Sequence, residues 1–186
     1  MITIVSGLPR SGTSLMMQML AAGGVPILSD GERVADADNP RGYHEWERIK
    51  LLPKDPACIA EAEGKAVKVI SQLLFALPAG REYRIIFMER PLEEVVASQA
   101  EMIRRRGTSG AAVPQAALIA GLRAHLNQVN AWLAQRGDLF IHRQEYHHVL
   151  REPLGAAENV QSFLGLTLDT GAMAQQVDPS LYRNRA

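Results

Sequence analysis

The sequence predicts a single-domain α/β protein in which a parallel β-sheet is flanked by helices on both faces. The chain of 186 residues has the length of one domain, and its 47% hydrophobic content is enough for a sizeable buried core. Short apolar runs alternate with longer helical segments, as in strand–helix–strand units whose strands are parallel. The first run, residues 2–6 (ITIVS), has no polar alternation, which is typical of a strand covered on both faces. We therefore expect residues 1–186 to form one domain.

The expected strands are the short apolar runs at residues 2–6, 25–28, 65–70, 83–88 and 138–142. The run YRIIFM at 83–88 is the clearest, because β-branched and aromatic residues favour strands. Ligands of parallel sheets bind at the carboxyl ends of the strands. Gly7 and Arg90 each follow the end of an expected strand, so we expect both to face one crevice.

Helices are expected between these runs, at residues 13–22, 55–63, 71–77, 91–106, 114–135 and 153–164. Residues 13–22 (TSLMMQMLAA) are rich in strong helix formers, and two glycines follow them. Pro91 suits the first position of a helix and Gly107 suits its end. Residues 107–113 (GTSGAAV) are expected to be a flexible link.

Charge and cysteine content exclude several classes of protein. The net charge is zero, so no overall field would attract nucleic acid or an acidic membrane, and we expect neither as a partner. Cys58 is the single cysteine, which excludes an intrachain disulfide and fits a reducing compartment. The chain has no apolar stretch long enough to span a bilayer and no signal-peptide pattern at its N-terminus. We therefore expect a soluble, cytoplasmic protein.

Residues 7–14 (GLPRSGTS) have the context of a phosphate-binding loop (P-loop), because they follow a strand and open a helix. Glycines let backbone amides approach an anion, and the helix N-terminus adds partial positive charge. The hydroxyls of Ser11, Thr13 and Ser14 are further donors, and Arg10 can bind phosphate or sulfate through two parallel hydrogen bonds. The G-x-x-x-x-G spacing is that of NTPases, but Thr13 stands where those proteins require lysine. A turn that binds no ligand is the alternative.

The segment PRSGTSL at 9–15 resembles the 5′-phosphosulfate loop of sulfotransferases that use 3′-phosphoadenosine 5′-phosphosulfate (PAPS). Cytosolic members usually carry Pro-Lys-Ser-Gly-Thr-Thr, whereas tyrosylprotein and many bacterial members carry Pro-Arg-Ser-Gly-Thr, as here. The resemblance implies PAPS as cofactor, no required metal, and a role for Arg10 in helping the sulfuryl group to leave. The cofactor-binding residues that it implies in this loop are Pro9, Arg10, Ser11, Gly12, Thr13 and Ser14.

Residues 85–98 (IIFMERPLEEVVAS) contain a second candidate anion site. Arg90 lies at a strand-to-helix junction, and Ser98 follows about two helical turns later. Sulfotransferases carry an Arg and a Ser with this separation, and the resemblance implies that Arg90 and Ser98 bind the 3′-phosphate. The alternatives are a surface ion pair of Arg90 with Glu93 or Glu94 and a neutral helix position for Ser98. Cytosolic members also bring a C-terminal Arg-Lys-Gly element to this phosphate.

This chain lacks the Arg-Lys-Gly element, and Arg183 or Arg185 could replace it, although a frayed basic terminus is the alternative. A further basic run, Arg104-Arg105-Arg106, is expected to offset a helix dipole; a basic edge for an acidic acceptor is the alternative. The histidines at 142, 147 and 148 lack the spacing of a metal site, so we expect no metal.

Transfer to an acceptor also requires a general base. A polar segment at residues 29–48 has several turn signals, and such a loop in a compact domain is often functional. The candidates that it contains are Glu32, His44, Glu45 and Glu47. Tyrosylprotein enzymes carry a catalytic Glu near the position of Gly31-Glu32, and bacterial members often carry a stretch like residues 39–45 (NPRGYHE). We rank Glu32 first and Glu45 second as catalytic residues, and expect Glu32→Ala to lower turnover at least about tenfold.

Two other functions stay open beside a sulfotransferase acting on a hydroxyl or amine. The first is a P-loop kinase or hydrolase, because Glu89 ends an apolar run as the metal-linked acid of NTPases does. The second is a relative that binds nucleotide without catalysis. The acceptor itself is open: a small molecule, a glycan and a peptide all fit the sequence.

Overall fold

The fold is described from a computed structural model, which describes residues 1–32, 35–36, 39, 41–105, 107 and 113–182. Within these residues, four parallel strands form one sheet in the order β2-β1-β3-β4. The strands are β1 (Ile2–Gly7), β2 (Ala66–Lys68), β3 (Tyr83–Glu89) and β4 (Leu139–Glu145). The predicted single-domain α/β class with a parallel sheet is therefore confirmed.

The α-helices are α1 (Thr13–Ala22), α2 (Leu92–Arg105), α3 (Gln115–Ala134), α4 (Tyr146–Arg151), α5 (Pro153–Leu164) and α6 (Thr170–Gln175). Shorter 3₁₀ helices are η1 (Glu47–Leu51), η2 (Pro56–Ala62), η3 (Ser71–Ala76) and η4 (Pro179–Leu181). Among the described residues, no helix is both long enough and apolar enough to cross a lipid bilayer.

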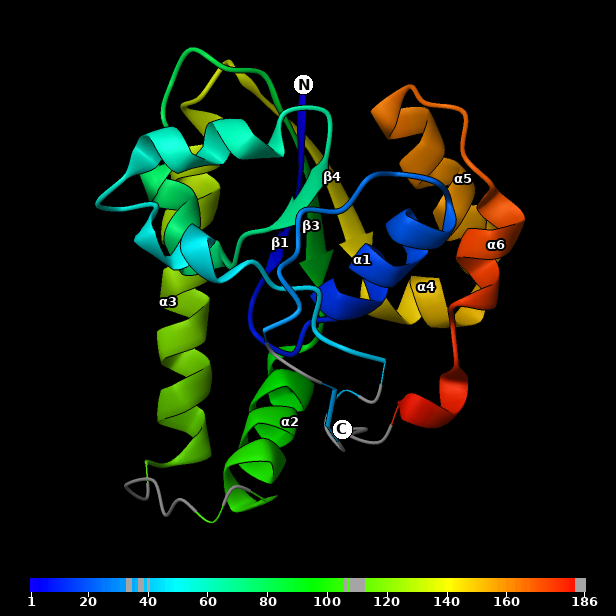
Figure 1. Cartoon of the computed structure of the whole chain (residues 1–186). Coiled ribbons are helices and arrows are strands. Elements are labelled where there is room, and N and C mark those ends of the chain that lie inside the picture. The colour runs from blue at the N-terminus through cyan, green and yellow to red at the C-terminus, as the bar shows by residue number, and fades with distance from the viewer. Residues whose placement is uncertain (33–34, 37–38, 40, 106, 108–112, 183–186) are drawn as a thin grey trace.

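Both faces of the sheet are covered by helices, as expected (Figure 1). Successive strand residues point to opposite faces, so neighbouring positions enter different cores. On one face, Ile4 and Ile85 pack with side chains from α3 and from η1, η2 and η3. On the other face, Val5 and Ile86 pack with side chains from α1, α4, α5 and α6. The central strand β1 is buried along its whole length, which explains its continuous apolar run.

The carboxyl ends of the strands meet at one edge of the sheet, because Gly7 pairs with Met88 and Glu89 pairs with Glu145. The loop from β1 to α1 lies at this edge, and α2 lies beyond the arrowheads of the strands (Figure 1). The polar segment also comes to this edge. Gln18 of α1 donates to the carbonyl oxygen of Gly42 at 3.3 Å, and Arg41 donates to that of Gln176 at 2.6 Å.

Several sequence expectations differ from the structure. The expected strand at 25–28 is wrong, since only a single bridge between Ile27 and Ala66 forms there. Two local features explain this: the amide of Val25 bonds back to Leu20 at the end of α1, and Pro26 has no amide hydrogen to donate. The expected helices at 55–63 and 71–77 form as 3₁₀ helices, and α4 and α6 were not expected.

Three expectations concern residues outside the described ranges. The expected helix at 91–106 appears as α2, which ends at Arg105, and Arg106 is not described. Of the expected link at 107–113, only the two end residues are described. Arg183 and Arg185 also lie outside the described residues.

Candidate functional site

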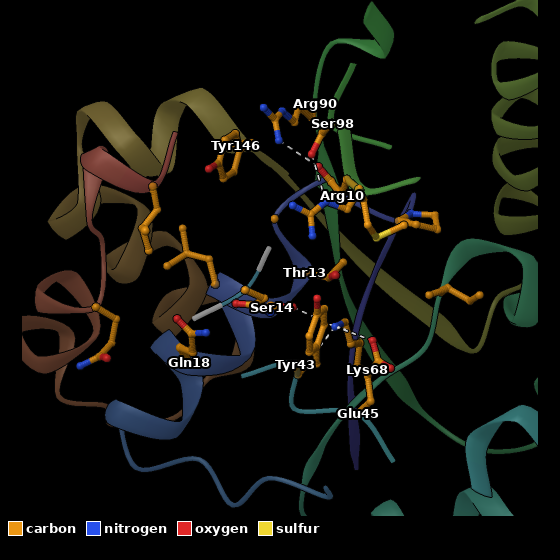
Figure 2. A pocket seen from close by; sticks show the side chains of 18 of the residues that line it. Arg10, Thr13, Ser14, Gln18, Tyr43, Glu45, Lys68, Arg90, Ser98 and Tyr146 are labelled. Atoms are coloured by element: carbon orange, nitrogen blue, oxygen red, sulfur yellow. Dashed lines mark hydrogen bonds and ion pairs between the residues drawn. The ribbon is translucent and has the colours of Figure 1, made fainter. Parts of the chain in front are cut away.

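A cavity of about 370 Å³ opens at the carboxyl edge of the sheet, where ligands of parallel sheets bind. Its walls come from the loop after β1, the first turns of α1, the end of β2, one side of α2, and parts of segments 39–50 and 176–181. Figure 2 shows two groups of side chains in this cavity. The arginine end contains Arg10, Arg90 and Ser98, and the lysine end contains Tyr43, Glu45 and Lys68.

Most of the sequence-predicted residues line this cavity. They are Pro9, Arg10, Gly12, Thr13, Ser14, Glu45, Arg90 and Ser98. Ser11 and Glu32 are not among the described residues that line it. Ser11 is buried at 1% exposure and lines a second cavity of about 310 Å³. Its hydroxyl has no hydrogen-bond partner among the described residues.

The loop after β1 requires glycine at position 12 for two reasons. Gly12 has a φ of 102°, which lies in the left-handed region that side chains disfavour. A Cβ atom there would also lie 2.5 Å from Cδ2 of Tyr146. Gly12 is the N-cap residue of α1, so the partial positive charge of the helix N-terminus faces the cavity beside Thr13 and Ser14.

Arg10 connects the loop to the second anion segment. It is one of two described non-glycine residues with positive φ, at 76°, a conformation that costs about 1–2 kcal/mol. Its carbonyl oxygen accepts a hydrogen bond from Nη1 of Arg90 at 3.0 Å. Its Nε donates to Oγ of Ser98, also at 3.0 Å. Such strain is characteristic of functional sites, and here two contacts from the second segment hold it in place.

Arg90 both forms an ion pair with Glu94 and lines the cavity, which are the two possibilities that the sequence left open. Its Nε donates to Oε2 of Glu94 at 2.9 Å, so an ion pair with Glu94 does form. This pair is not a surface pair, because the two side chains are only 7% and 4% exposed. Arg90 nevertheless lines the cavity, and its guanidinium carbon lies 4.7 Å from the ring centroid of Tyr146. The arginine end therefore presents a buried, oriented guanidinium, which suits an anion.

The lysine end depends on Lys68, which sequence reasoning did not single out. Lys68 is only 6% exposed, and its Nζ donates to Oγ of Ser14 at 3.0 Å. Nζ also donates to the carbonyl oxygen of Tyr43 at 2.8 Å and lies 3.3 Å from Oε1 of Glu45. A signal existed in the sequence: a lysine inside the apolar run KAVKVI is unusual unless its charge has partners. A buried cation thus lies beside the loop, although it comes from β2.

Glu45 and Glu32, the two proposed catalytic carboxylates, lie in different environments. The Glu45 side chain is 21% exposed and is paired with Lys68 within the cavity. Its backbone is also fixed, since its carbonyl oxygen accepts from the hydroxyl of Ser29 at 3.0 Å and from the amide of Asp30 at 3.2 Å. Glu32 is exposed on the polar segment. The structure therefore brings Glu45 to the loop and does not bring Glu32 there.

The remaining base candidates are also outside the described cavity lining. His44 has a φ of 49°, and burial, together with the charge of Lys68, lowers the pKa of its imidazole. Glu47 forms an ion pair with Lys50, and its amide donates to Asp30.

Arg105 is the one described residue of the Arg104-Arg105-Arg106 run that lines the cavity. It forms an ion pair with Glu101 at 2.8 Å. Hydrogen bonds from Arg104 and then Arg105 lower the pKa of Glu101 to about 2. Glu101 therefore offsets one of the two described positive charges of this basic edge where it meets the cavity.

Glu89, the acidic residue on which the kinase alternative rests, is not among the described residues that line the first cavity. Glu89 forms an ion pair with Arg143 at 2.6 Å and lines the second cavity beside Ser11. Within the part of the chain that the structure describes, no group of three or more His, Cys, Asp or Glu side chains is placed to bind a metal ion.

No protein-family model matches the chain, and no curated protein matches its sequence. Solved structures do match its fold. The sulfotransferase domain from the curacin biosynthetic pathway aligns with a TM-score of 0.54 at 15% identity, over 95% of this chain and 77% of that one. The sulfotransferase STF1 from Mycobacterium tuberculosis H37Rv aligns with a TM-score of 0.58 at 16% identity, over 97% and 73%. A sugar kinase from Janibacter sp. HTCC2649 reaches a TM-score of 0.42 at 14% identity over 91% and 96%, too low to argue a shared fold. The chain thus has a sulfotransferase-like fold.

Proposed function

We propose that this chain is a sulfotransferase that moves a sulfuryl group from PAPS to a hydroxyl or amine of an acceptor. One observation carries the proposal. The loop that resembles a 5′-phosphosulfate loop and the segment that resembles a 3′-phosphate site are hydrogen bonded to each other in one cavity, through Arg10 and Ser98, which are 88 residues apart. The sulfotransferase-like fold supports this interpretation.

The residues present fit a nucleotide that carries phosphate at both the 3′ and the 5′ positions of its ribose. The first turn of α1 borders the cavity at Thr13 and Ser14, where an anion would meet backbone amides. Arg10 would contact the 5′-phosphosulfate, and Arg90 with Ser98 would contact the 3′-phosphate. PAPS would supply the activated sulfuryl group. The chain itself would supply the stabilisation of charge on the leaving phosphate, through Arg10 and the loop amides.

The acceptor would bind near the lysine end, and Glu45 would take its proton. This assignment places the base at the second of the two carboxylates ranked from the sequence, because Glu45 lies in the cavity and Glu32 does not. Lys68 would hold the Glu45 carboxylate in position through its contact of 3.3 Å. The neighbouring walls include Trp46 and Ile49, which offer apolar surface to the body of the acceptor. A small molecule, a glycan or a peptide could present the reacting hydroxyl or amine there.

Binding of the desulfated product, 3′,5′-adenosine bisphosphate, tests the proposal. We would measure its binding by calorimetry beside AMP, ADP and ATP, with and without Mg²⁺. The expected result is metal-independent binding that needs the 3′-phosphate and that weakens at least about tenfold in Arg90→Ala. A preference for ATP with Mg²⁺ would overturn the proposal in favour of a kinase or hydrolase.

Turnover separates an enzyme from a relative that only binds nucleotide. We would follow the formation of 3′,5′-adenosine bisphosphate from PAPS with a panel of acceptors: a nitrophenol, an amino sugar, a tyrosine peptide and a long-chain alcohol. Stimulation by one of them supports transfer. Nucleotide binding without turnover on any of them would identify a non-catalytic relative.

A further inference from the structure

A polar cluster centred on the buried Glu94 lies behind Arg90, on the side of α2 that meets α4 and the C-terminal segment. Its centre is Glu94, which accepts a hydrogen bond from the hydroxyl of Tyr182 at 2.7 Å. Nε2 of His147 lies 2.9 Å from the same carboxylate oxygen, Oε1. The other oxygen, Oε2, accepts from Nε of Arg90. Three segments of the chain that are far apart in sequence therefore meet at one carboxylate.

The cluster is costly to bury unless its hydrogen bonds are made. Burial alone would raise the pKa of Glu94, but hydrogen bonds from Tyr182, Arg90 and His147 outweigh it and lower the pKa below its usual range. A carboxylate that is 4% exposed and held by three donors has little freedom to move. It therefore fixes the guanidinium of Arg90 from one side.

The hydrogen bonds of the cluster run in a defined direction. Tyr182 has one hydroxyl hydrogen, which it donates to Glu94, so its oxygen must accept in its 3.0 Å contact with Nε2 of His147. His147 therefore carries a hydrogen on Nε2, and this one hydrogen is shared between Oε1 of Glu94 and the Tyr182 oxygen. The Tyr182 ring also lies 5.5 Å from the guanidinium carbon of Arg90 and packs edge-on against Tyr146 at 5.8 Å.

We propose that Tyr182, His147 and Glu94 are positioning residues for the arginine end of the cavity, so that the C-terminal segment takes part in recognising the 3′-phosphate of the nucleotide. The inference rests on the proposed function. Of the described residues, Arg90 and Tyr146 line the cavity and these three do not, so they act on a ligand indirectly, through Arg90, which Glu94 holds, and through Tyr146, against which Tyr182 packs. Tyr182 would thus support the 3′-phosphate site indirectly, whereas a C-terminal arginine or lysine would contact the phosphate itself.

The variant Tyr182→Phe tests this role, because it removes one hydroxyl and changes neither the net charge nor the ring. The readout is the ratio of the dissociation constants for AMP and for 3′,5′-adenosine bisphosphate, which isolates the 3′-phosphate. We expect the ratio to fall about fivefold or more, through weaker bisphosphate binding and unchanged AMP binding. His147→Phe, which also keeps a ring, should lower the ratio in the same way if Tyr182→Phe does not fold.

Tyr83→Phe is the matched control. Its hydroxyl donates to the carbonyl oxygen of Pro78 at 3.1 Å, at the opposite end of β3 from Arg90. This variant also loses one tyrosine hydrogen bond, so it should lower stability and leave the ratio unchanged. In an Arg90→Ala background, Tyr182→Phe should weaken bisphosphate affinity less than it does in the wild-type background, because the route through Arg90 is gone.

The outcomes separate the two proposals. A wild-type protein that does not prefer the bisphosphate to AMP overturns the proposed function. A wild-type preference that Tyr182→Phe and His147→Phe leave intact overturns the positioning role alone. An equal fall in the ratio for Tyr83→Phe would also overturn it, since the effect would then follow general destabilisation.

Discussion

The two ends of the cavity are built in different ways. The arginine end comes from two continuous stretches, residues 7–14 and 89–98, and each stretch joins the end of a strand to the start of a helix. The lysine end comes from single side chains on β2 and on the polar segment. Anions are bound by backbone amides and helix termini, which neighbouring residues supply together. Proton transfer needs a few side chains from any part of the chain, provided that the fold brings them together.

This comparison predicts that substitutions at the two ends have different kinetic signatures. Changes at the arginine end should weaken both nucleotide binding and transfer. Changes at the lysine end should lower transfer and spare nucleotide binding.

Arg10→Ala should have the largest effect. Transfer from PAPS should fall by about 10²–10³-fold, the cost of removing one donor to charge that develops in the reaction. Product release with the best acceptor of the panel measures it, and binding of 3′,5′-adenosine bisphosphate should weaken in parallel. Arg104→Ala is the control, since Arg104 is 74% exposed and is not among the described residues that line the cavity. Equal effects of the two variants would contradict the role of Arg10.

Glu45→Gln should lower transfer by about 10²-fold, because a general base is lost. The dissociation constant for 3′,5′-adenosine bisphosphate should stay close to the wild-type value, because Glu45 lies at the other end. Glu32→Gln, which also replaces a carboxylate of the polar segment, should leave transfer unchanged. The reverse result would move the base to Glu32 and would mean that the polar segment rearranges when substrates bind.

Lys68→Met should lower transfer by about tenfold, because Glu45 loses the cation that holds it and Ser14 loses a donor. Replacing one partner of a buried pair leaves the other charge with less compensation, so thermal stability should also fall. Turnover and a melting curve measure the two effects. Lys65→Met, at the amino end of the same strand run, is the control. Weaker bisphosphate binding in Lys68→Met than in Glu45→Gln would show that Lys68 belongs to both ends.

The smallest expected effect is on stability, and it compares Gly12→Ala with Gly24→Ala. Both glycines flank α1 and both have positive φ, at 102° and 94°, so alanine is strained at each. A Cβ at position 24 meets open space, whereas one at position 12 meets Tyr146. Gly12→Ala should therefore lose about 1 kcal/mol more free energy of unfolding in urea than Gly24→Ala. Equal losses would mean that the Tyr146 ring moves aside without cost.

Local signals were reliable where one short stretch decides the structure. Residues 13–22 were expected as a helix and form α1 with the same bounds, because strong helix formers are followed by two glycines. The expected strand at 25–28 failed because an apolar run does not reveal that its first amide closes the preceding helix. The helix expected at 55–63 forms as the 3₁₀ helix Pro56–Ala62, and its type was not predicted.

The residues of the candidate site differ in the same way: some were predicted from short stretches of sequence, and others were not. Arg10, Arg90 and Ser98 were predicted because short stretches around them resemble sulfotransferase motifs, and all three line the cavity. Lys68 was not found, because its partners lie 23, 25 and 54 residues away and only the fold joins them. The order of Glu32 and Glu45 could not be judged for the same reason, since both lie on one polar segment.

The sequence by itself determined the fold class and the glycine-rich loop between β1 and α1. Strand–helix alternation and glycine conformation act between neighbouring residues, so they can be recognised without the fold. Tertiary structure alone decided that the Arg90–Glu94 pair is buried, that Lys68 reaches Ser14 and Glu45, and that Tyr182 returns to α2 from 88 residues away. Buried charges and hydroxyls need partners because water is excluded, and long-range packing chooses which partners they find.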